Sequence, residues 1–182
     1  LHNLGGGTAK TVFASIISRY QDPDGDLGIS DEGWEIAAKF LGNAHNIADG
    51  EDAVGSVIDG TYPMDEHWAS GVLTEQKDRD YKFQIMTPDI GEPYVVESLA
   101  ISAGTKKYDT CVAFLNWLGS SDVQLDWSNN YGTIPCQKEA LDQVSDDIKE
   151  LMETLKPQDL DWSFIAENVD AWVEKAELEY VQ

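Results

Sequence analysis

Basic residues are scarce in this chain. Its 182 residues include 12 Lys plus Arg against 34 Asp plus Glu, which gives a formal net charge of −22 at pH 7. A surface with this charge repels the phosphates of nucleic acids and the headgroups of anionic lipids. The composition therefore excludes nucleic-acid binding. It predicts either a plainly solvated acidic surface or one that attracts cationic ligands.

Long apolar runs are also lacking. No apolar stretch reaches the roughly 20 residues that a membrane-spanning helix needs, and the chain begins without Met and without a basic and apolar signal segment. We therefore expect a processed or trimmed chain. The two cysteines, Cys111 and Cys136, have neither metal-site nor redox-motif spacing, and either a disulfide or two free thiols fits the sequence.

The common motifs of enzymes are missing as well. The chain has no P-loop, no G-x-S-x-G and no H-E-x-x-H. Its histidines, His2, His45 and His67, lack the spacing of metal ligands. We predict neither an enzymatic activity nor a cofactor. The apolar share of 42% is nevertheless enough for a folded domain with its own core.

The clearest structural pattern lies between Phe83 and Cys136. Residues 83–88 and 95–101 have the apolar, β-branched character of strands, and a break at Gly91 separates them. A helix is expected over 109–120, with an apolar face broad enough to be mostly buried. Strands and helices that alternate in this way predict an α/β protein.

Three blocks of this region resemble type II extracellular solute-binding proteins, which serve ABC importers. The blocks are PDIGEPYVVESLAI at 88–101, AFLNWLGSSDVQ at 113–124 and NNYGTIP at 129–135. The tail at 161–180 is similar to the last helix of the branch that carries iron, thiamine, sugar phosphates and aminoalkylphosphonates. VESLAI at 96–101 is more similar to the polyamine binders. The resemblance covers the later half of such a protein.

The resemblance implies a periplasmic-binding-protein-like type II αβα lobe with a mixed sheet and C-terminal packing helices. The implied parts are the core of the second, C-terminal lobe at 1–86, the hinge crossing and a segment returning toward the first lobe at 87–136, and the C-terminal helices at 137–182. Apolar spacings of three and four predict two helices there, over 137–155 and 163–180. A lobe without its partner exposes an apolar face, so we expect the chain alone to form a homodimer.

The function that the resemblance implies is capture of a small polar solute in an interlobe cleft, with delivery to the membrane permease of an ABC importer. The location would be extracytoplasmic, either periplasmic or anchored at the cell surface. The expected solute is a zwitterion, a phosphorylated compound or phosphonate, or a polyamine-like compound. Ferric iron is not expected, because the tandem tyrosines of the family's iron binders are absent.

Gly7 and Thr8 begin an expected helix whose first-turn N–H groups and dipole favour an anion. Many family members have a small-Gly-Thr motif here, usually with Ser where this chain has Gly6. The resemblance therefore implies that Gly7 and Thr8 contact the solute. The alternative is an ordinary helix start preceded by flexible glycines.

Other implied ligand residues follow later in the chain. In the family the loop containing Tyr62, Asp65 and Trp68 helps to line the cleft. There an aromatic ring offers a flat wall for a sugar or alkyl stem, and a carboxylate pairs with an amine. Polyamine binders place an amine-binding carboxylate at the position of Glu97, next to Ser98. The alternatives are a helix-stabilising Asp65, a core Trp68 and a solvent-facing Glu97.

One acidic loop is similar to a calcium-binding EF-hand loop. Asp22, Asp24 and Asp26 occupy its first, third and fifth places, but Leu27 and Gly33 stand where a glycine and a bidentate glutamate are required. The alternatives are a calcium-dependent or sensory binding module and a surface turn followed by a helix that Ser30 caps.

Overall fold

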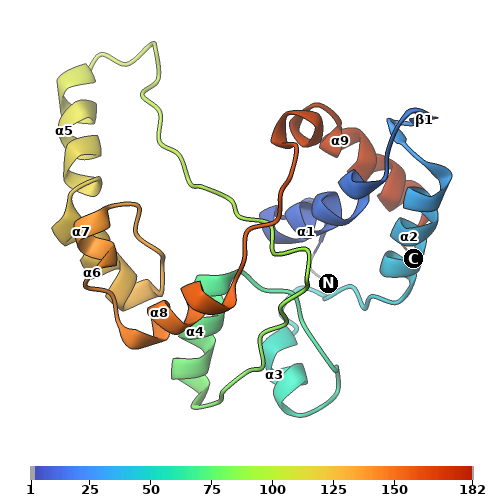
Figure 1. Cartoon of the computed structure of the whole chain (residues 1–182), viewed down its shortest axis with the longest axis horizontal. Coiled ribbons are helices and arrows are strands. Elements are labelled where there is room, and N and C mark those ends of the chain that lie inside the picture. The colour runs from blue at the N-terminus through green and yellow to red at the C-terminus, as the bar shows by residue number, and fades with distance from the viewer. Residues whose placement is uncertain (1–2, 182) are drawn as a thin grey trace. The chain divides into compact units, whose positions relative to one another are not determined.

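The computed structural model describes residues 3–181, and it is mostly helical (Figure 1). Its elements are α1 (Gly7–Ile17), a 3-10 turn η1 (Ser18–Tyr20), β1 (Gln21–Asp26), α2 (Asp31–Gly42), α3 (Ala53–Ile58), α4 (Ala69–Arg79), α5 (Tyr108–Leu118), α6 (Ser121–Tyr131), α7 (Lys138–Leu141), α8 (Asp146–Thr154) and α9 (Trp162–Glu179). The chain forms two compact units. Unit 1 joins the chain up to His67 with the chain from Gln158 onward, and unit 2 is Trp68–Pro157.

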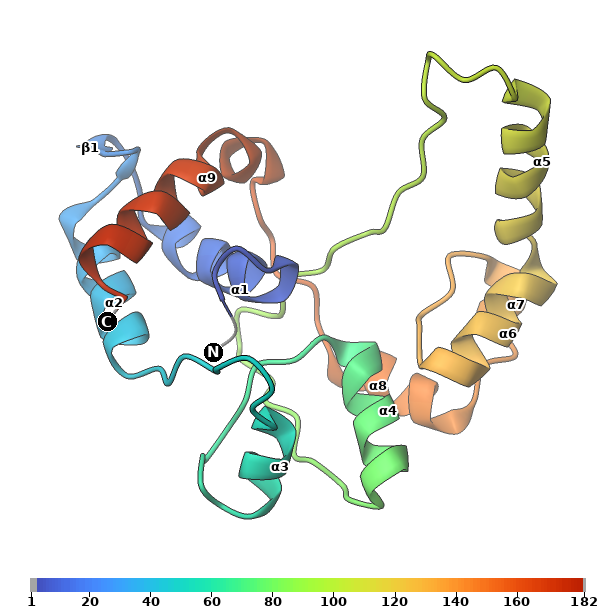
Figure 2. The ribbon, with the colours of Figure 1, turned by 180° about the vertical axis from the view of Figure 1, so that it is seen from behind.

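Unit 1 is built from α1, α2 and α9, which lie against one another (Figure 2). Each helix repeats apolar residues at spacings of three and four, so one face of each is apolar and turns inward. The fully buried centre of this core includes Phe13, Ile17, Ile29 and Trp172. The expected helices that begin near Gly7 and over 163–180 are confirmed as α1 and α9.

The starts of α2 and α9 follow local capping rules. The Ser30 hydroxyl accepts a hydrogen bond from the Gly33 N–H at 3.3 Å, which confirms the predicted cap of α2. The Asp161 carboxylate accepts hydrogen bonds from the N–H groups of Ser163 at 3.1 Å and Phe164 at 3.0 Å. These side chains satisfy amides that have no partner within the helix.

Unit 2 packs α4, α6 and α7 around a smaller core, in which Ser128, Ala140, Val144, Ile148 and Leu151 are buried. Gly132 explains the glycine of the NNYGTIP block. It ends α6 with a φ of +70°, and a Cβ built on it would lie 3.0 Å from the Ser70 carbonyl oxygen of α4. Only glycine permits both the left-handed turn and this close approach.

The predicted strands at 83–88 and 95–101 are not strands in this structure. Both segments are extended coil, and the nearest pairing is one isolated parallel bridge between Glu92 and Pro157. A strand is stable only when a neighbouring strand pairs its N–H and C=O groups. Among residues 3–181, β1 and isolated bridges are therefore all that is seen of the expected mixed sheet.

Two helix predictions are also corrected. The helix expected over 137–155 is divided into α7 and α8, because Ser145 is followed by two acidic residues in a strong helix-start signal. The helix expected over 109–120 forms as α5, but it contains no buried residue. The compact units place α7 and α8 in unit 2 and α9 in unit 1, and the division at 86/87 and 136/137 stays a prediction.

Across residues 3–181, the helices are too short or too polar to cross a bilayer.

Candidate functional site

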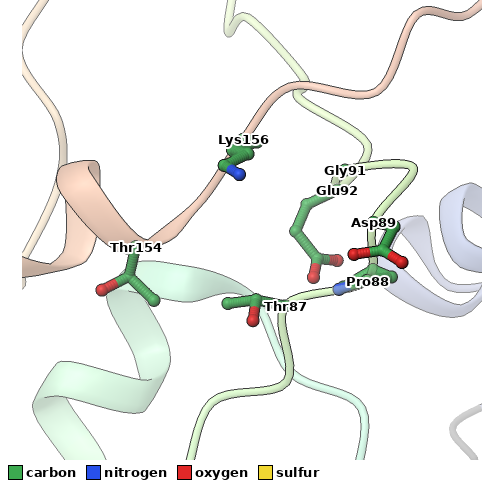
Figure 3. A pocket seen from close by; sticks show the side chains of 7 residues that line it. All are labelled: Thr87, Pro88, Asp89, Gly91, Glu92, Thr154 and Lys156. Carbon is green, nitrogen blue, oxygen red and sulfur yellow. The ribbon is translucent and has the colours of Figure 1, made fainter.

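A polar cavity of about 160 Å³ lies in unit 2, between the turn that follows Thr87 and the chain that leaves α8. Its lining residues are Thr87, Pro88, Asp89, Gly91, Glu92, Thr154 and Lys156 (Figure 3). The cavity therefore includes Thr87 and Pro88, at the start of the range 87–136 that is predicted to contain the hinge crossing.

Backbone hydrogen bonds hold the two walls of the cavity together. The Gly91 N–H donates to the Pro88 carbonyl at 2.9 Å and closes a turn in which Gly91 has a φ of +86°. The next amide, that of Glu92, donates to the Lys156 carbonyl at 2.7 Å. The turn thus directs the Glu92 side chain toward residues that are distant in the sequence.

Charged groups of both signs line the cavity. In Figure 3 the carboxylates of Asp89 and Glu92 lie on one side, and Thr154 and Lys156 lie across from them. Burial raises the pKa of Glu92 above its ordinary value. Burial, and then the negative charge of Glu92, raise the pKa of Tyr94.

The raised pKa of Glu92 predicts a pH-dependent effect of Glu92→Gln. The folded chain holds a proton on Glu92 more tightly than the unfolded chain, so this contribution to stability is present at low pH and is lost as pH rises through the folded pKa. We therefore expect Glu92→Gln to raise the melting temperature at pH 7. The gain should vanish below about pH 4.3, the ordinary pKa of glutamate.

Melting curves followed by circular dichroism between pH 4 and 7 test this expectation. Glu139→Gln, at an exposed residue of α7, controls for the loss of one negative charge. A gain from Glu92→Gln that does not change with pH, or that equals the effect of Glu139→Gln, would contradict the assigned burial effect.

The cavity offers polar groups that can bind a solute. Carboxylates, hydroxyl groups and an ammonium group can hydrogen-bond a polar solute and pair its charges. The volume is below the roughly 300–1,000 Å³ of common ligand pockets. The cavity by itself therefore accommodates one polar group of a solute and not a whole solute of ordinary size.

The predicted ligand residues of unit 1 lie in different local environments. Gly7 and Thr8 form the first turn of α1, where the N-cap Gly6 provides no side-chain hydrogen bond. Tyr62 donates its hydroxyl proton to Glu51 at 3.1 Å, and its ring stacks on His45 at 4.7 Å between ring centroids. Their role in binding stays a prediction.

The Glu51 carboxylate interacts with the His45 ring, the Ala48 N–H and the Tyr62 hydroxyl. The Ala48 N–H, and then His45, lower the pKa of Glu51, while burial and Glu51 raise the pKa of Tyr62. Asp65 is nearly buried, and its carboxylate oxygen lies 3.9 Å from Nδ1 of His67. The structure therefore gives Tyr62 and Asp65 partners within unit 1.

The predicted ligand residues of unit 2 are exposed. Trp68 is the N-cap residue of α4, and Glu97 and Ser98 lie in the extended coil after the cavity. The Ser98 hydroxyl donates to the Val96 carbonyl at 3.4 Å. None of these three side chains lines the cavity.

The acidic loop forms a tight hairpin between η1 and α2, and calcium binding there stays a prediction. The Asp22 N–H donates to the Gly28 carbonyl at 2.9 Å, and the Asp22 carboxylate accepts from the Asp24 N–H at 3.0 Å. Asp26 pairs with Lys175 at 3.2 Å. Within residues 3–181, no group of three or more acidic, histidine or cysteine side chains is arranged to hold a metal ion.

Cys111 and Cys136 are both free thiols in unit 2. Cys111 is half-buried, with Sγ 3.9 Å from the Thr105 hydroxyl, and Cys136 is exposed. Of the two possibilities that the sequence leaves open, a disulfide or two free thiols, the structure shows two free thiols.

Sequence reasoning missed four residues of the cavity: Asp89, Glu92, Thr154 and Lys156. The Pro-x-x-Gly turn was a visible signal for Asp89 and Glu92. Nothing in the local pattern of Thr154 and Lys156 indicates a neighbour near residue 92, because that contact is formed only in the folded chain.

The small polar cavity carries charges of both signs, which can pair with the charges of a polar molecule. Comparison with known proteins agrees. Residues 7–156 match the bacterial extracellular solute-binding proteins, and this chain belongs to that family. The resemblance stated from the sequence is therefore confirmed.

A relative from Sinorhizobium fredii, the probable ABC transporter periplasmic-binding protein y4fP, is 33% identical to this chain over 175 residues. The matched region is 96% of this chain and 48% of the relative. The chain thus spans about half the length of this curated relative. No solved structure matches the chain.

Proposed function

We propose that this chain is a solute-binding part of an ABC importer. It captures a small polar solute reversibly and presents it to a membrane permease, on the outer side of the cytoplasmic membrane. The observation that carries the proposal is the family match over residues 7–156, which contains all the lining residues of the polar cavity. The name of the Sinorhizobium fredii relative supports the ABC transporter assignment.

The finer proposal concerns the fold and the cleft. The chain forms the second αβα lobe of a type II binding protein, and residues 83–88 and 95–101 join its mixed sheet when the rest of the sheet is present. The solute lies in a cleft between two lobes. The small volume of the cavity supports this arrangement, because a second wall is needed to surround a whole solute.

The proposed solute carries a cationic group and an anionic or hydroxylated group. Asp89 and Glu92 are suited to an ammonium group, and Lys156 with Thr154 is suited to a phosphate, phosphonate or carboxylate. Zwitterions, phosphonates, sugar phosphates and polyamines are the classes to test. The residues that the family resemblance implies remain proposed contacts of the solute: Gly7, Thr8, Tyr62, Asp65, Trp68, Glu97 and Ser98.

A thermal-shift series on the chain tests the proposal. Aminoalkylphosphonates, sugar phosphates, polyamines and thiamine are each added at rising concentration. A ligand that binds only the folded chain at 100 times its Kd stabilises it by about 2.7 kcal/mol, so the melting temperature must rise with concentration. At least one class is expected to produce such a rise.

Matched variants locate the site. Glu92→Gln is expected to reduce the shift caused by a cationic solute, whereas Asp142→Asn, at an exposed acidic residue in the same unit, is expected to preserve it. If the chain is folded and no solute class raises its melting temperature, this result would count against solute capture. Equal losses in both variants would count against the cavity as its site.

A further inference from the structure

One lysine ammonium group of unit 1 lies between aromatic rings and carboxylates. The Lys175 Nζ lies 5.1 Å from the centre of the Trp34 ring and 5.9 Å from the centre of the Tyr180 ring. Both distances are within the roughly 6 Å over which an aromatic face attracts a cation. The same Nζ lies 3.2 Å from the Asp26 carboxylate and 2.7 Å from the Glu179 carboxylate. We name these two rings and two carboxylates the ammonium cage.

The cage joins three segments that are distant in the sequence. Trp34 belongs to α2, Asp26 ends β1, and Glu179 ends α9. Figure 1 and Figure 2 both show the end of α9 beside α2. The Trp34 indole N–H donates to the Asp26 carbonyl at 3.0 Å, and the Trp34 and Tyr180 rings lie 6.2 Å apart between centroids. These contacts hold the walls of the cage together without using the lysine.

The lysine in the cage differs from an ordinary surface ion pair. The Lys175 side chain is 18% exposed, whereas the Lys39 side chain, which pairs with Glu35 along α2, is 69% exposed. The Lys175 stem is thus mostly covered, and its ammonium group meets the carboxylates. Lys175→Ala removes Cγ, Cδ, Cε and Nζ, which together correspond to one propylammonium ion. The substitution therefore leaves a space with the shape of that ion.

The chemistry of the cage favours a primary ammonium group over a metal ion. An ammonium group has three N–H donors, so it can donate to both carboxylates while its charge faces the rings. Calcium takes roughly six to eight oxygen ligands. Two carboxylates beside two aromatic rings do not provide such a shell.

We infer that the ammonium cage is a binding site for primary alkylammonium groups, which the chain fills with its own Lys175. In the native chain the lysine is a tethered ligand that fastens the β1 hairpin to α9. A tethered ligand has an effective concentration on the order of millimolar, so a free amine competes poorly with it. The cage lies in unit 1 and the polar cavity in unit 2, so the inference does not depend on the proposed solute capture.

Chemical rescue of Lys175→Ala tests the inference. The substitution is expected to lower the melting temperature, because it empties the cage. Propylammonium chloride at rising concentration is expected to raise the melting temperature of this variant again by about 2–4 °C, the shift that one cation–π contact of ordinary strength produces in a chain of this size. Sodium chloride at equal concentration controls for screening of the negative charge.

Lys175→Met is the matched control variant. Methionine fills the space of the lysine stem and carries no charge, so propylammonium has no room to enter and no rescue is expected. The native chain is also expected to be insensitive to the amine. Added to Lys175→Ala, Tyr180→Leu is expected to abolish the rescue, whereas Tyr131→Leu, at an exposed ring of α6 in unit 2, is expected to preserve it.

Three results would overturn the inference. The first is that propylammonium stabilises Lys175→Ala no more than sodium chloride does; if this variant is unfolded in buffer, the same comparison is made on recovery of its helical circular dichroism. The second is an equal rise in Lys175→Met, which would place the amine outside the cage. The third is a rescue that Tyr180→Leu reduces no more than Tyr131→Leu does.

Discussion

Replacing Trp172 with alanine is expected to destabilise unit 1 by about 3–5 kcal/mol, the cost of removing a large aromatic side chain from a packed core. Trp172 is fully buried and its ring lies 5.2 Å from that of Phe164. Its indole N–H also donates to the Leu27 carbonyl at 2.9 Å. The substitution therefore leaves both a cavity and a carbonyl without this donor.

Urea unfolding followed by circular dichroism measures this loss. Trp162→Ala is the matched control, because Trp162 lies on the same helix, α9, and is exposed. We expect the control to change the free energy of unfolding by much less. If Trp172→Ala and Trp162→Ala lower the free energy of unfolding by similar amounts, the packing role that the burial of Trp172 indicates would be contradicted.

The second large effect is expected from Gly25→Ala in the β1 hairpin. A Cβ at this position would collide with the carbonyl oxygen of Ile29, and backbone atoms cannot move aside as the end of a flexible side chain can. The Gly25 carbonyl also accepts the Gly28 N–H at 3.1 Å inside the same turn. We expect a loss of about 1–3 kcal/mol, typical of overpacking.

Gly42→Ala is the control for the second prediction. Gly42 is the last residue of α2, and nothing lies within 4 Å of the Cβ that alanine would add. Alanine favours a helix over glycine by up to about 1 kcal/mol, so this variant is expected to be neutral or stabilising. The comparison is made by urea unfolding, and an equal loss in the two glycine variants would contradict the steric argument.

In the acidic hairpin, a basic side chain from another helix lies beside one of the predicted calcium ligands. Lys175 reaches Asp26 at 3.2 Å and Glu179 at 2.7 Å, and its ammonium group lies 5.1 Å from the centre of the Trp34 ring. Hydrogen bonds to Glu179, and then to Asp26, raise the pKa of Lys175. Lys175, from the distant helix α9, thus places a positive charge beside Asp26, one of the three aspartates whose spacing suggests a calcium ion.

Local patterns predicted the helices of unit 1 well. The helix expected to begin at Gly7 and Thr8, the helix after the Ser30 cap and the helix expected over 163–180 are each present in the structure. Helical hydrogen bonds join residues four apart, so the sequence around each residue carries most of the information. The same reasoning missed the division of 137–155, where a second start signal at Ser145 outweighed the continuous stripe.

Family membership and the acidic character of the protein were also readable from the chain alone. The order of the blocks at 88–101, 113–124 and 129–135 indicated the solute-binding family, and the match over 7–156 confirms it. The net charge of −22 requires no structure to interpret. Both properties depend on composition and order, which folding does not alter.

The tertiary structure decided the features that depend on distant residues. It brought Glu92 to Lys156 through a backbone hydrogen bond of 2.7 Å, left residues 95–101 without a strand partner, and paired Asp26 with Lys175. Sequence alone determined the family, the charge and the three main helices of unit 1, because these follow from composition and short-range periodicity. The cavity and the unpaired segment follow from long-range contacts, which no local pattern contains.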